Sequence, residues 1–272
     1  MIPMFEILSQ EMKLRNFSTR TQEVYLYYNH HFLNYIKRSS KDITHNEIKK
    51  YLLYLDEKQY SSSSINLAHN ALAFYYGKIL KKNIWRIPFQ KREQKIREIL
   101  TTEEMKNLIN APQNPKHQLL IAMLYATGVR VNELTHIKLN DLNFNKKLLL
   151  VHQGKGKKDR YTILSENIII KIQSYLQHRK NKSDYLFETR DSHITDRTVQ
   201  QILKNARNKA RIKKTVTPHI LRHTFATHLM ENNVKTEYIQ QLLGHKDVRT
   251  TRIYEGITTK HLETIQSPHD NL

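Results

Sequence analysis

The sequence contains no cysteine among its 272 residues. Disulfide bonds, thiolate zinc sites, iron–sulfur clusters and a cysteine nucleophile are therefore excluded. No stretch approaches the about 18 consecutive apolar residues that a membrane-spanning helix needs. The N-terminal residues also lack a basic region followed by an apolar stretch and a cleavage site, so no signal peptide is indicated. We therefore expect a cytoplasmic protein that has no membrane segment.

Glycine is nearly as scarce, with six residues in the whole chain. Gly154 and Gly156 begin like a G-x-G-x-x-G motif, but Asp159 stands where its third glycine belongs, so a Rossmann dinucleotide site is not indicated. The Walker A motif also fails, because Gly156 and Lys157 are followed by another lysine in place of serine or threonine. The sequence predicts neither ATP hydrolysis nor any bound cofactor.

Acidic residues are few relative to basic ones. The chain has 25 Asp and Glu against 45 Lys and Arg, a net charge of +20. Hydrophobic residues make up 39% of the chain, which is typical of a globular protein and unlike a disordered polybasic tail. The charge indicates an anionic partner such as nucleic acid, and the length predicts two domains.

The first predicted domain, residues 1–82, is all-α, with four helices. Ser18 precedes apolar residues at three- and four-residue steps, which is the period of one helical face. Thr44 and Glu47 have the spacing of a capping box at the start of the next helix. The run Ser61–Ser64 predicts a turn, and the fourth amphipathic helix follows it from residue 65 to residue 80.

A basic linker is predicted at residues 83–99. Residues 81–97 hold seven Lys or Arg and one Glu, with Pro88 among them, so neither a packed helix nor a strand is favoured. Such a segment is either a solvated connection or a contact to the DNA backbone, where its cations would neutralise phosphates. Lys91 and Arg92 are the candidate DNA-binding residues of this linker.

The second predicted domain, residues 100–272, is α+β. Thr101 and Glu104 form another capping box, and an apolar helix over 117–127 stops at Gly128, before a short helix that runs through residue 134. Strand-like runs at 148–152 and 160–164 flank a glycine-lysine tip, which predicts a β-hairpin. Helices are expected at 166–180, 195–212, 218–231 and 236–243. The predicted fold class is therefore mainly α with a small β-hairpin.

A helix beginning at Pro218 holds the most informative group of polar residues. His219 and Arg222 lie three positions apart and so share one face, while an apolar stripe occupies the opposite face. Near a helix N-terminus such a pair can bind a phosphate, although in isolation a surface helix with incidental charges is the favoured interpretation. A zinc site at His219 and His223 is a third interpretation. It lacks the glutamate at position 220 and an evident third ligand, so we expect no metal.

Three further clusters have ordinary structural interpretations when each is taken alone. Arg130 and Glu133 follow a helix-ending glycine and could form a surface ion pair. Lys155 lies between two glycines at the hairpin tip, where the backbone can approach a ligand closely. His245 follows Gly244, a natural helix cap, and Tyr254 stands nine residues later as one of 15 tyrosines.

Together, the order and spacing of these elements are specific. Gly-x-Arg-x-x-Glu-Leu, a Gly-Lys-Gly hairpin, His-x-x-Arg-His-x-x-Ala-x-x-Leu, Leu-Gly-His and a later tyrosine follow one another along the chain. The pattern resembles the tyrosine recombinase (phage integrase) family over residues 100–260. The N-terminal helices are similar to that family's core-binding domain, and the compact two-domain length is similar to its Xer-type members.

This resemblance implies a reaction and a set of catalytic residues. The chain would cut and rejoin DNA strands through a 3′-phosphotyrosyl intermediate, without ATP or a metal. The residues implied as catalytic are Arg130, Lys155, His219, Arg222, His245 and Tyr254, with Glu133 orienting their side chains. Tyr254 would be the nucleophile, the two arginines would hold the scissile phosphate and Lys155 would be the general acid. His219 is the candidate base, since a phenol with an ordinary pKa of about 10 needs one at neutral pH.

The resemblance also implies partners. Family members clamp double-stranded DNA between two domains and act as four protomers on two DNA segments, so we expect inverted-repeat half-sites and a homotetramer. The tail over 258–272, with Leu262 and Ile265 on one short helical face, either docks into a neighbouring protomer or packs on its own domain. Arg197, Gln200 and Lys204 of the predicted helix 195–212 have side chains suited to reading bases.

Several functional alternatives stay open at this point. Xer-type action in chromosome dimer resolution is favoured, with a partner recombinase or a DNA translocase as a possible requirement. The nearest alternative is an integrase or excisionase of a mobile element. A non-catalytic DNA-binding protein is another, because residues 238–254 resemble a helix-turn-helix. A type IB topoisomerase shares the phosphotyrosyl chemistry.

Overall fold

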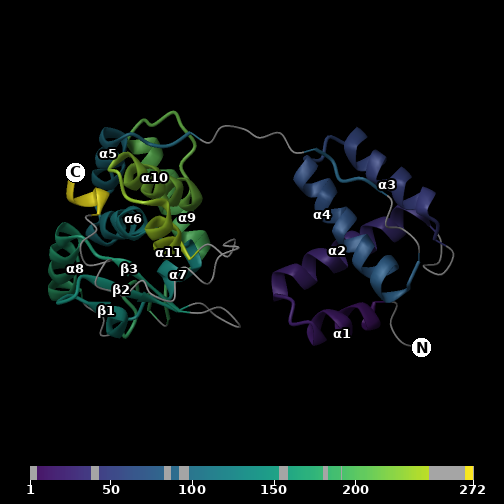
Figure 1. The fold of residues 1–272 in the computed structure, drawn as a ribbon, viewed down its shortest axis with the longest axis horizontal. Coiled ribbons are helices and arrows are strands. Elements are labelled where there is room, and N and C mark those ends of the chain that lie inside the picture. The colour runs from purple at the N-terminus through teal and green to yellow at the C-terminus, as the bar shows by residue number, and fades with distance from the viewer. Residues whose placement is uncertain are drawn as a thin grey trace. The chain divides into compact units, whose positions relative to one another are not determined.

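The computed structural model describes residues 5–37, 43–82, 87–91, 98–152, 159–179, 183–190, 192–244 and 267–271. The chain divides into two compact units, Met1–Lys95 and Ile96–Leu272 (Figure 1). Within the described ranges, no helix is both long and apolar enough to span a bilayer. The domain boundaries expected above, at 82/83 and 99/100, stay a prediction.

The first unit is a helical bundle. Its elements are α1 (Glu6–Leu14), α2 (Thr19–Ile36), α3 (His45–Glu57) and α4 (Ser62–Leu72), with the π-helix η2 (Ala73–Ile79) continuing α4. Hydroxyl groups of Ser18, Thr44 and Ser61 accept the free N–H groups at the starts of α2, α3 and α4. The capping box predicted at Thr44 is confirmed, since its backbone N–H donates to the Glu47 carboxylate at 2.8 Å.

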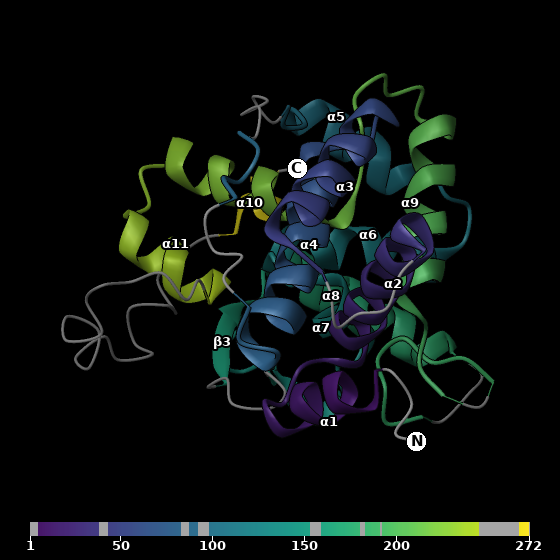
Figure 2. The same cartoon turned by 90° about the vertical axis from the view of Figure 1, so that its right-hand side faces the viewer.

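Aromatic residues fill the core of this unit. Phe32, Tyr51 and Tyr76 are fully buried, with ring centroids 5.1–5.6 Å from Phe32 to the two tyrosines. The Tyr51 hydroxyl is paired with His31 Nδ1 at 2.7 Å, which satisfies a polar group that burial would otherwise isolate. Figures 1 and 2 show α1 at one end of the bundle and α3 at the other.

The second unit contains more elements. Its helices are α5 (Thr102–Asn110), α6 (Pro115–Thr127), α7 (Val131–Thr135), α8 (Glu166–His178), α9 (Asp196–Lys209), α10 (Pro218–Glu231) and α11 (Thr236–Leu243), with the 3₁₀ turns η3 (Leu139–Asp141) and η6 (Pro268–Asn271). Its strands are β1 (Leu142–Asn143), β2 (Leu148–Val151) and β3 (Arg160–Ile163), which form one antiparallel sheet in the order β1-β2-β3.

Helix α6 is the centre of the second unit. Every residue from Leu119 to Thr127 is buried, because α5, α8, α9 and α10 all pack around it. A helix that is apolar on all sides needs such a position. The end of α6 is consequently fixed against α7, β3 and α10, and it provides a rigid base for the polar groups at that end.

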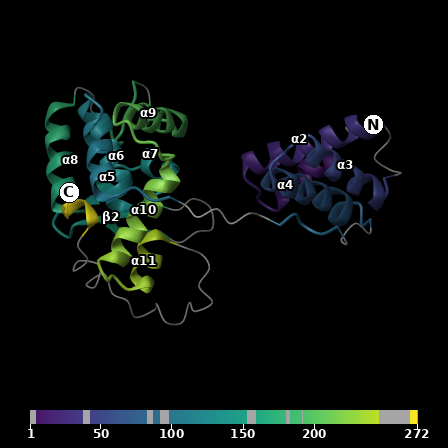
Figure 3. The same ribbon diagram turned by 90° about the horizontal axis from the view of Figure 1, so that it is seen from above.

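The predicted fold class, mainly α with a small sheet, is confirmed. Helices α8 and α9 end at His178 and Lys209, before the predicted 180 and 212, and β1 was not predicted. The expected helical face at Leu262 and Ile265 lies outside the described residues. The described part of the tail, η6, packs on α6, α8 and α10 of its own unit (Figure 3).

Candidate active site

The end of α6 is shaped by Gly128. This residue caps the helix in the left-handed conformation, with φ of +60°. A Cβ atom at this position would lie 2.4 Å from Cδ1 of the buried Phe225, so only glycine fits without displacing α10. The tight turn points the Gly128 carbonyl oxygen at α10, where it accepts a hydrogen bond from Arg222.

Arg222 is buried, with 7% of its surface exposed. Its guanidinium donates to the Gly128 carbonyl at 2.6 Å and to the Leu243 carbonyl at the end of α11. Burial, and then repulsion from Arg130 and Arg160, lowers the pKa of Arg222 to about 10. The sequence predicted that His219 and Arg222 share a face, but His219 is exposed whereas Arg222 points into the unit. The alternative of an incidental surface charge is therefore wrong for Arg222.

Glu133 connects two other arginines. Its carboxylate accepts hydrogen bonds from both terminal nitrogens of Arg160, at 2.9 and 2.7 Å. It also accepts from the side chain and the backbone N–H of Arg130, each at 2.7 Å. Burial opposes ionisation of Glu133, but these donors outweigh it and lower its pKa to about 2. The ion pair between Arg130 and Glu133 is present, but the alternative of an ordinary surface pair is wrong, because the Glu133 side chain is only 9% exposed.

Arg160 belongs to this cluster, although it is not among the site residues predicted from the sequence. Its side chain is 6% exposed, and its Nε donates to the Leu242 carbonyl at 2.8 Å. Its two terminal nitrogens donate to the Glu133 carboxylate. The sequence pattern around Arg160 could have indicated that its side chain is buried. Arg160 alternates with Thr162 on strand β3, so both side chains point to the buried face, where a charged residue needs a partner.

The arginine cluster, defined as Arg130, Arg160, Arg222 and Glu133, has three positive groups and one negative group. Arg160 and Arg222 hold the last carbonyls of α11, so this helix end is fixed to the cluster. The excess positive charge beside the partly exposed Arg130 can attract an anion. Such an arrangement can bind a phosphodiester and stabilise negative charge that develops on it.

The base of the β2–β3 connection is closed by His152. Its two ring nitrogens pair with Asp159 and Asp141, each at 2.9 Å. The hydrogen bond that His152 donates to Asp159, offset by partial burial and supported by Asp141, raises the pKa of His152. Since Asp141 lies in η3, these contacts join both strands of the hairpin to the preceding turn.

The other predicted site residues lie partly outside and partly within the described ranges. Lys155, His245, Tyr254 and Arg92 lie outside the described residues. Lys91 is exposed, and so are Arg197, Gln200 and Lys204, which share one face of α9. Arg207, on the same helix, instead donates to the carbonyls of residues 212, 213 and 214. Across the described ranges, no three His, Asp or Glu side chains gather into a metal site.

Comparisons with known proteins cover both units. A family model described as "Phage integrase family" matches residues 98–261. A second, "Phage integrase, N-terminal SAM-like domain", matches residues 4–85. The two matched segments together span most of the chain, and the arginine cluster lies within the first.

Individual relatives agree with the family models. The chain is 35% identical over 256 residues to a tyrosine recombinase XerA from Pyrococcus horikoshii, covering 92% of this chain and 88% of that protein. A crystal structure of XerA recombinase shares 32% identity and covers 95% of both chains, with a TM-score of 0.54. A lambda integrase dimer bound to a core site shares the fold, with a TM-score of 0.71, 20% identity and coverage of 89% and 94%.

Proposed function

The chain belongs to the phage integrase family as a tyrosine recombinase of the Xer type, and we propose how its residues divide the reaction. Site-specific recombination by such an enzyme requires an attacking group, a site for the scissile phosphate and a proton donor for the leaving oxygen. The arginine cluster is the observation that carries the proposal.

Arg130 and Arg222 form the proposed phosphate site. A phosphodiester is anionic and repels nucleophiles, so fixed guanidinium groups are needed to offset the charge that builds on its non-bridging oxygens. Arg222 is held by two backbone carbonyls and Arg130 by Glu133, so both are oriented before DNA binds. The repulsion among the three arginines favours binding of an anion between them. Glu133 and Arg160 act as positioning residues.

Tyr254 is the proposed nucleophile and His219 the proposed base. The phenol oxygen of Tyr254 attacks phosphorus, its proton passes to His219, and the bond from phosphorus to the 5′ oxygen breaks. His219 lies on the first turn of α10, exposed and three residues before Arg222, which is a suitable place for a group that faces bound DNA. His245, two residues beyond Leu243 at the fixed end of α11, is proposed as a further hydrogen-bond donor to the phosphate.

Lys155 is the proposed general acid. It belongs to the connection between β2 and β3, whose base is closed by His152 and Asp159. A proton from Lys155 to the 5′ oxygen makes that oxygen a good leaving group. The phosphotyrosyl bond then retains the energy of the phosphodiester, so that a 5′ hydroxyl of another strand can reverse the steps without ATP.

DNA is the proposed partner, and assembly on it is expected. The lambda integrase with this fold was solved as a dimer bound to a core site. We propose that four protomers act on two inverted-repeat sites, that Lys91 and Arg92 contact the backbone, and that Arg197, Gln200 and Lys204 of α9 read bases. Chromosome dimer resolution in the cytoplasm, with a partner recombinase or a DNA translocase, is the proposed setting.

The proposal can be tested with a nicked duplex that carries a site selected from a random library. A denaturant-resistant protein–DNA adduct is expected, because the nick lets the cleaved strand diffuse away before religation. Lys155→Ala should lose cleavage on the ordinary duplex and regain it on a 5′-thio duplex, whose leaving group needs no proton. Equal impairment on both substrates would contradict the general-acid role. A single asymmetric footprint without an adduct would favour a plain DNA-binding protein.

A further inference from the structure

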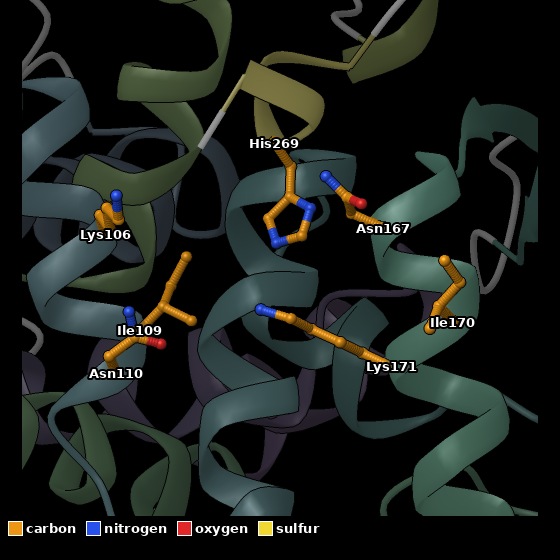
Figure 4. Close-up of a pocket in the computed structure, with 7 residues that line it drawn as sticks. All are labelled: Lys106, Ile109, Asn110, Asn167, Ile170, Lys171 and His269. Atoms are coloured by element: carbon orange, nitrogen blue, oxygen red, sulfur yellow. The ribbon is translucent and has the colours of Figure 1, made fainter.

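A pocket of about 220 Å³ lies between α5, α8 and the C-terminal turn η6 (Figure 4). Its lining residues are Lys106, Ile109, Asn110, Asn167, Ile170, Lys171 and His269. Two are lysines, two are amides, and none of these seven is acidic. None of them belongs to the arginine cluster, so the pocket is a separate feature of the second unit.

His269 forms the buried wall of the pocket. Only 2% of its surface is exposed, and its Nδ1 lies 3.1 Å from the Ser165 hydroxyl. Its Nε2 has no hydrogen-bond partner among the described residues, although the atom is buried. Figure 4 shows this nitrogen directed into the pocket, toward the amino group of Lys171. A buried polar atom of this kind calls for a ligand or an ordered water.

The hydrogen bonds of Ser165 indicate whether Nε2 of His269 is a hydrogen-bond donor or acceptor. The Ser165 oxygen already accepts the N–H of Ile168 at 3.1 Å, so its own proton is available for Nδ1 of His269. Burial, and then the charge of Lys171, lowers the pKa of His269 to about 4, so the ring is neutral at pH 7. A neutral ring that accepts at Nδ1 has its proton on Nε2 and presents a donor to the pocket.

We propose that this pocket binds a small phosphate-bearing anion, held by Nε2 of His269 and the amino group of Lys171, with the flexible Lys106 side chain turning in from the α5 wall to add a second amino group. The two lysine charges match a phosphate dianion, and the amides of Asn110 and Asn167 can supply further donors. The volume lies below the about 300 Å³ at which pockets for drug-sized ligands begin, which favours inorganic phosphate or a small phosphate ester.

A bound anion would tie the C-terminal turn to the body of its own unit. His269 comes from η6, whereas Lys106 and Lys171 come from α5 and α8. The turn is already held by the Ser267 hydroxyl, which donates to the Ala126 carbonyl at 3.1 Å. The anion adds a contact between the turn and two helices, so its concentration sets how firmly this segment stays on its own protomer.

The test is a phosphate titration of the full chain, followed through the ¹⁵N resonances of its histidines at constant ionic strength. The His269 signal is assigned by its loss in His269→Gln. Inorganic phosphate should move this signal saturably, and Lys171→Gln should weaken the fitted affinity by about tenfold or more. Lys146→Gln, at an exposed lysine of the same unit, should leave the affinity unchanged. Phosphate that binds the arginine cluster does not affect this local readout.

Three results would overturn the proposal. The His269 signal could stay in place over the titration. It could move equally in the wild type and in Lys171→Gln, together with the other histidine signals, which would indicate a general ionic effect. It could also respond to a short duplex of random sequence and not to free phosphate, which would assign the pocket to the DNA backbone.

Discussion

Replacing Glu133 with glutamine removes a buried negative charge that hydrogen-bonds to both Arg130 and Arg160. The glutamine amide keeps the size and part of the hydrogen bonding of the carboxylate. It leaves three arginines close together without their counter-charge, two of them, Arg160 and Arg222, almost fully buried. The substitution therefore tests whether Glu133 holds the cluster together.

The expected loss in the free energy of unfolding follows from the pKa of Glu133. It falls from an ordinary value of 4.5 to about 2 in the folded protein. Since each pKa unit is worth about 1.4 kcal/mol, ionised Glu133 stabilises the fold by about 3 kcal/mol at neutral pH. Because the folded pKa is depressed, this contribution is present above about pH 4.5 and is lost as the pH falls toward 2. Breaking a buried ion pair elsewhere costs a similar amount.

The assay is urea denaturation followed by circular dichroism, with hydrogen exchange of peptides from 96–272 to isolate the second unit. Glu133→Gln should lower the free energy of unfolding by about 3 kcal/mol at pH 7, and the difference from wild type should shrink below pH 4.5. Glu166→Gln is the matched control, since Glu166 pairs with Lys147 at 2.5 Å on the surface and should have no measurable effect. Equal effects of the two substitutions, or a difference that does not change with pH, would refute the reasoning.

Three further residues of the second unit, Gly128, Arg160 and His152, can be tested by substitution. Gly128→Ala should lower the free energy of unfolding by about 3 kcal/mol in urea denaturation, because it adds left-handed strain and a clash with the buried Phe225 ring. Arg160→Lys should slow adduct formation by about tenfold or more while DNA affinity stays unchanged, because lysine cannot hold both Glu133 oxygens and the Leu242 carbonyl together. His152 has a raised pKa, so its stabilisation is complete below pH 6.5 and is lost as the pH rises through the folded pKa. Protection factors of hairpin amides should therefore fall over that range in the wild type and stay constant in His152→Gln.

Local patterns were sufficient to predict most helices. The capping boxes at Thr44 and Thr101 predicted the starts of α3 and α5, and Pro218 predicted that of α10. These signals depend on residues three or four positions apart, so they can be read without knowledge of the fold. Strand β1 was missed because two residues are too few to show alternation.

The candidate site was less predictable, because it depends on distant backbone groups. Periodicity placed Arg222 on a helix but could not show its burial, since the carbonyls that hold it belong to residues 94 and 21 positions away. Arg160 was overlooked although its alternation with Thr162 was readable, because its partners also come from other elements. Motif order, in contrast, predicted the family that the comparisons show.

Tyr254 is the residue proposed to attack the scissile phosphate. The most direct measurement is mass spectrometry of the covalent protein–DNA adduct after digestion, in the wild type, Tyr254→Phe and the control Tyr238→Phe, with Tyr238 lying on α11. We predict that the nucleotide is attached to the peptide containing Tyr254, that Tyr238→Phe forms the same adduct, and that Tyr254→Phe binds DNA normally but forms none. An adduct that persists in Tyr254→Phe, or a nucleotide attached to another residue, would show that Tyr254 is not the nucleophile.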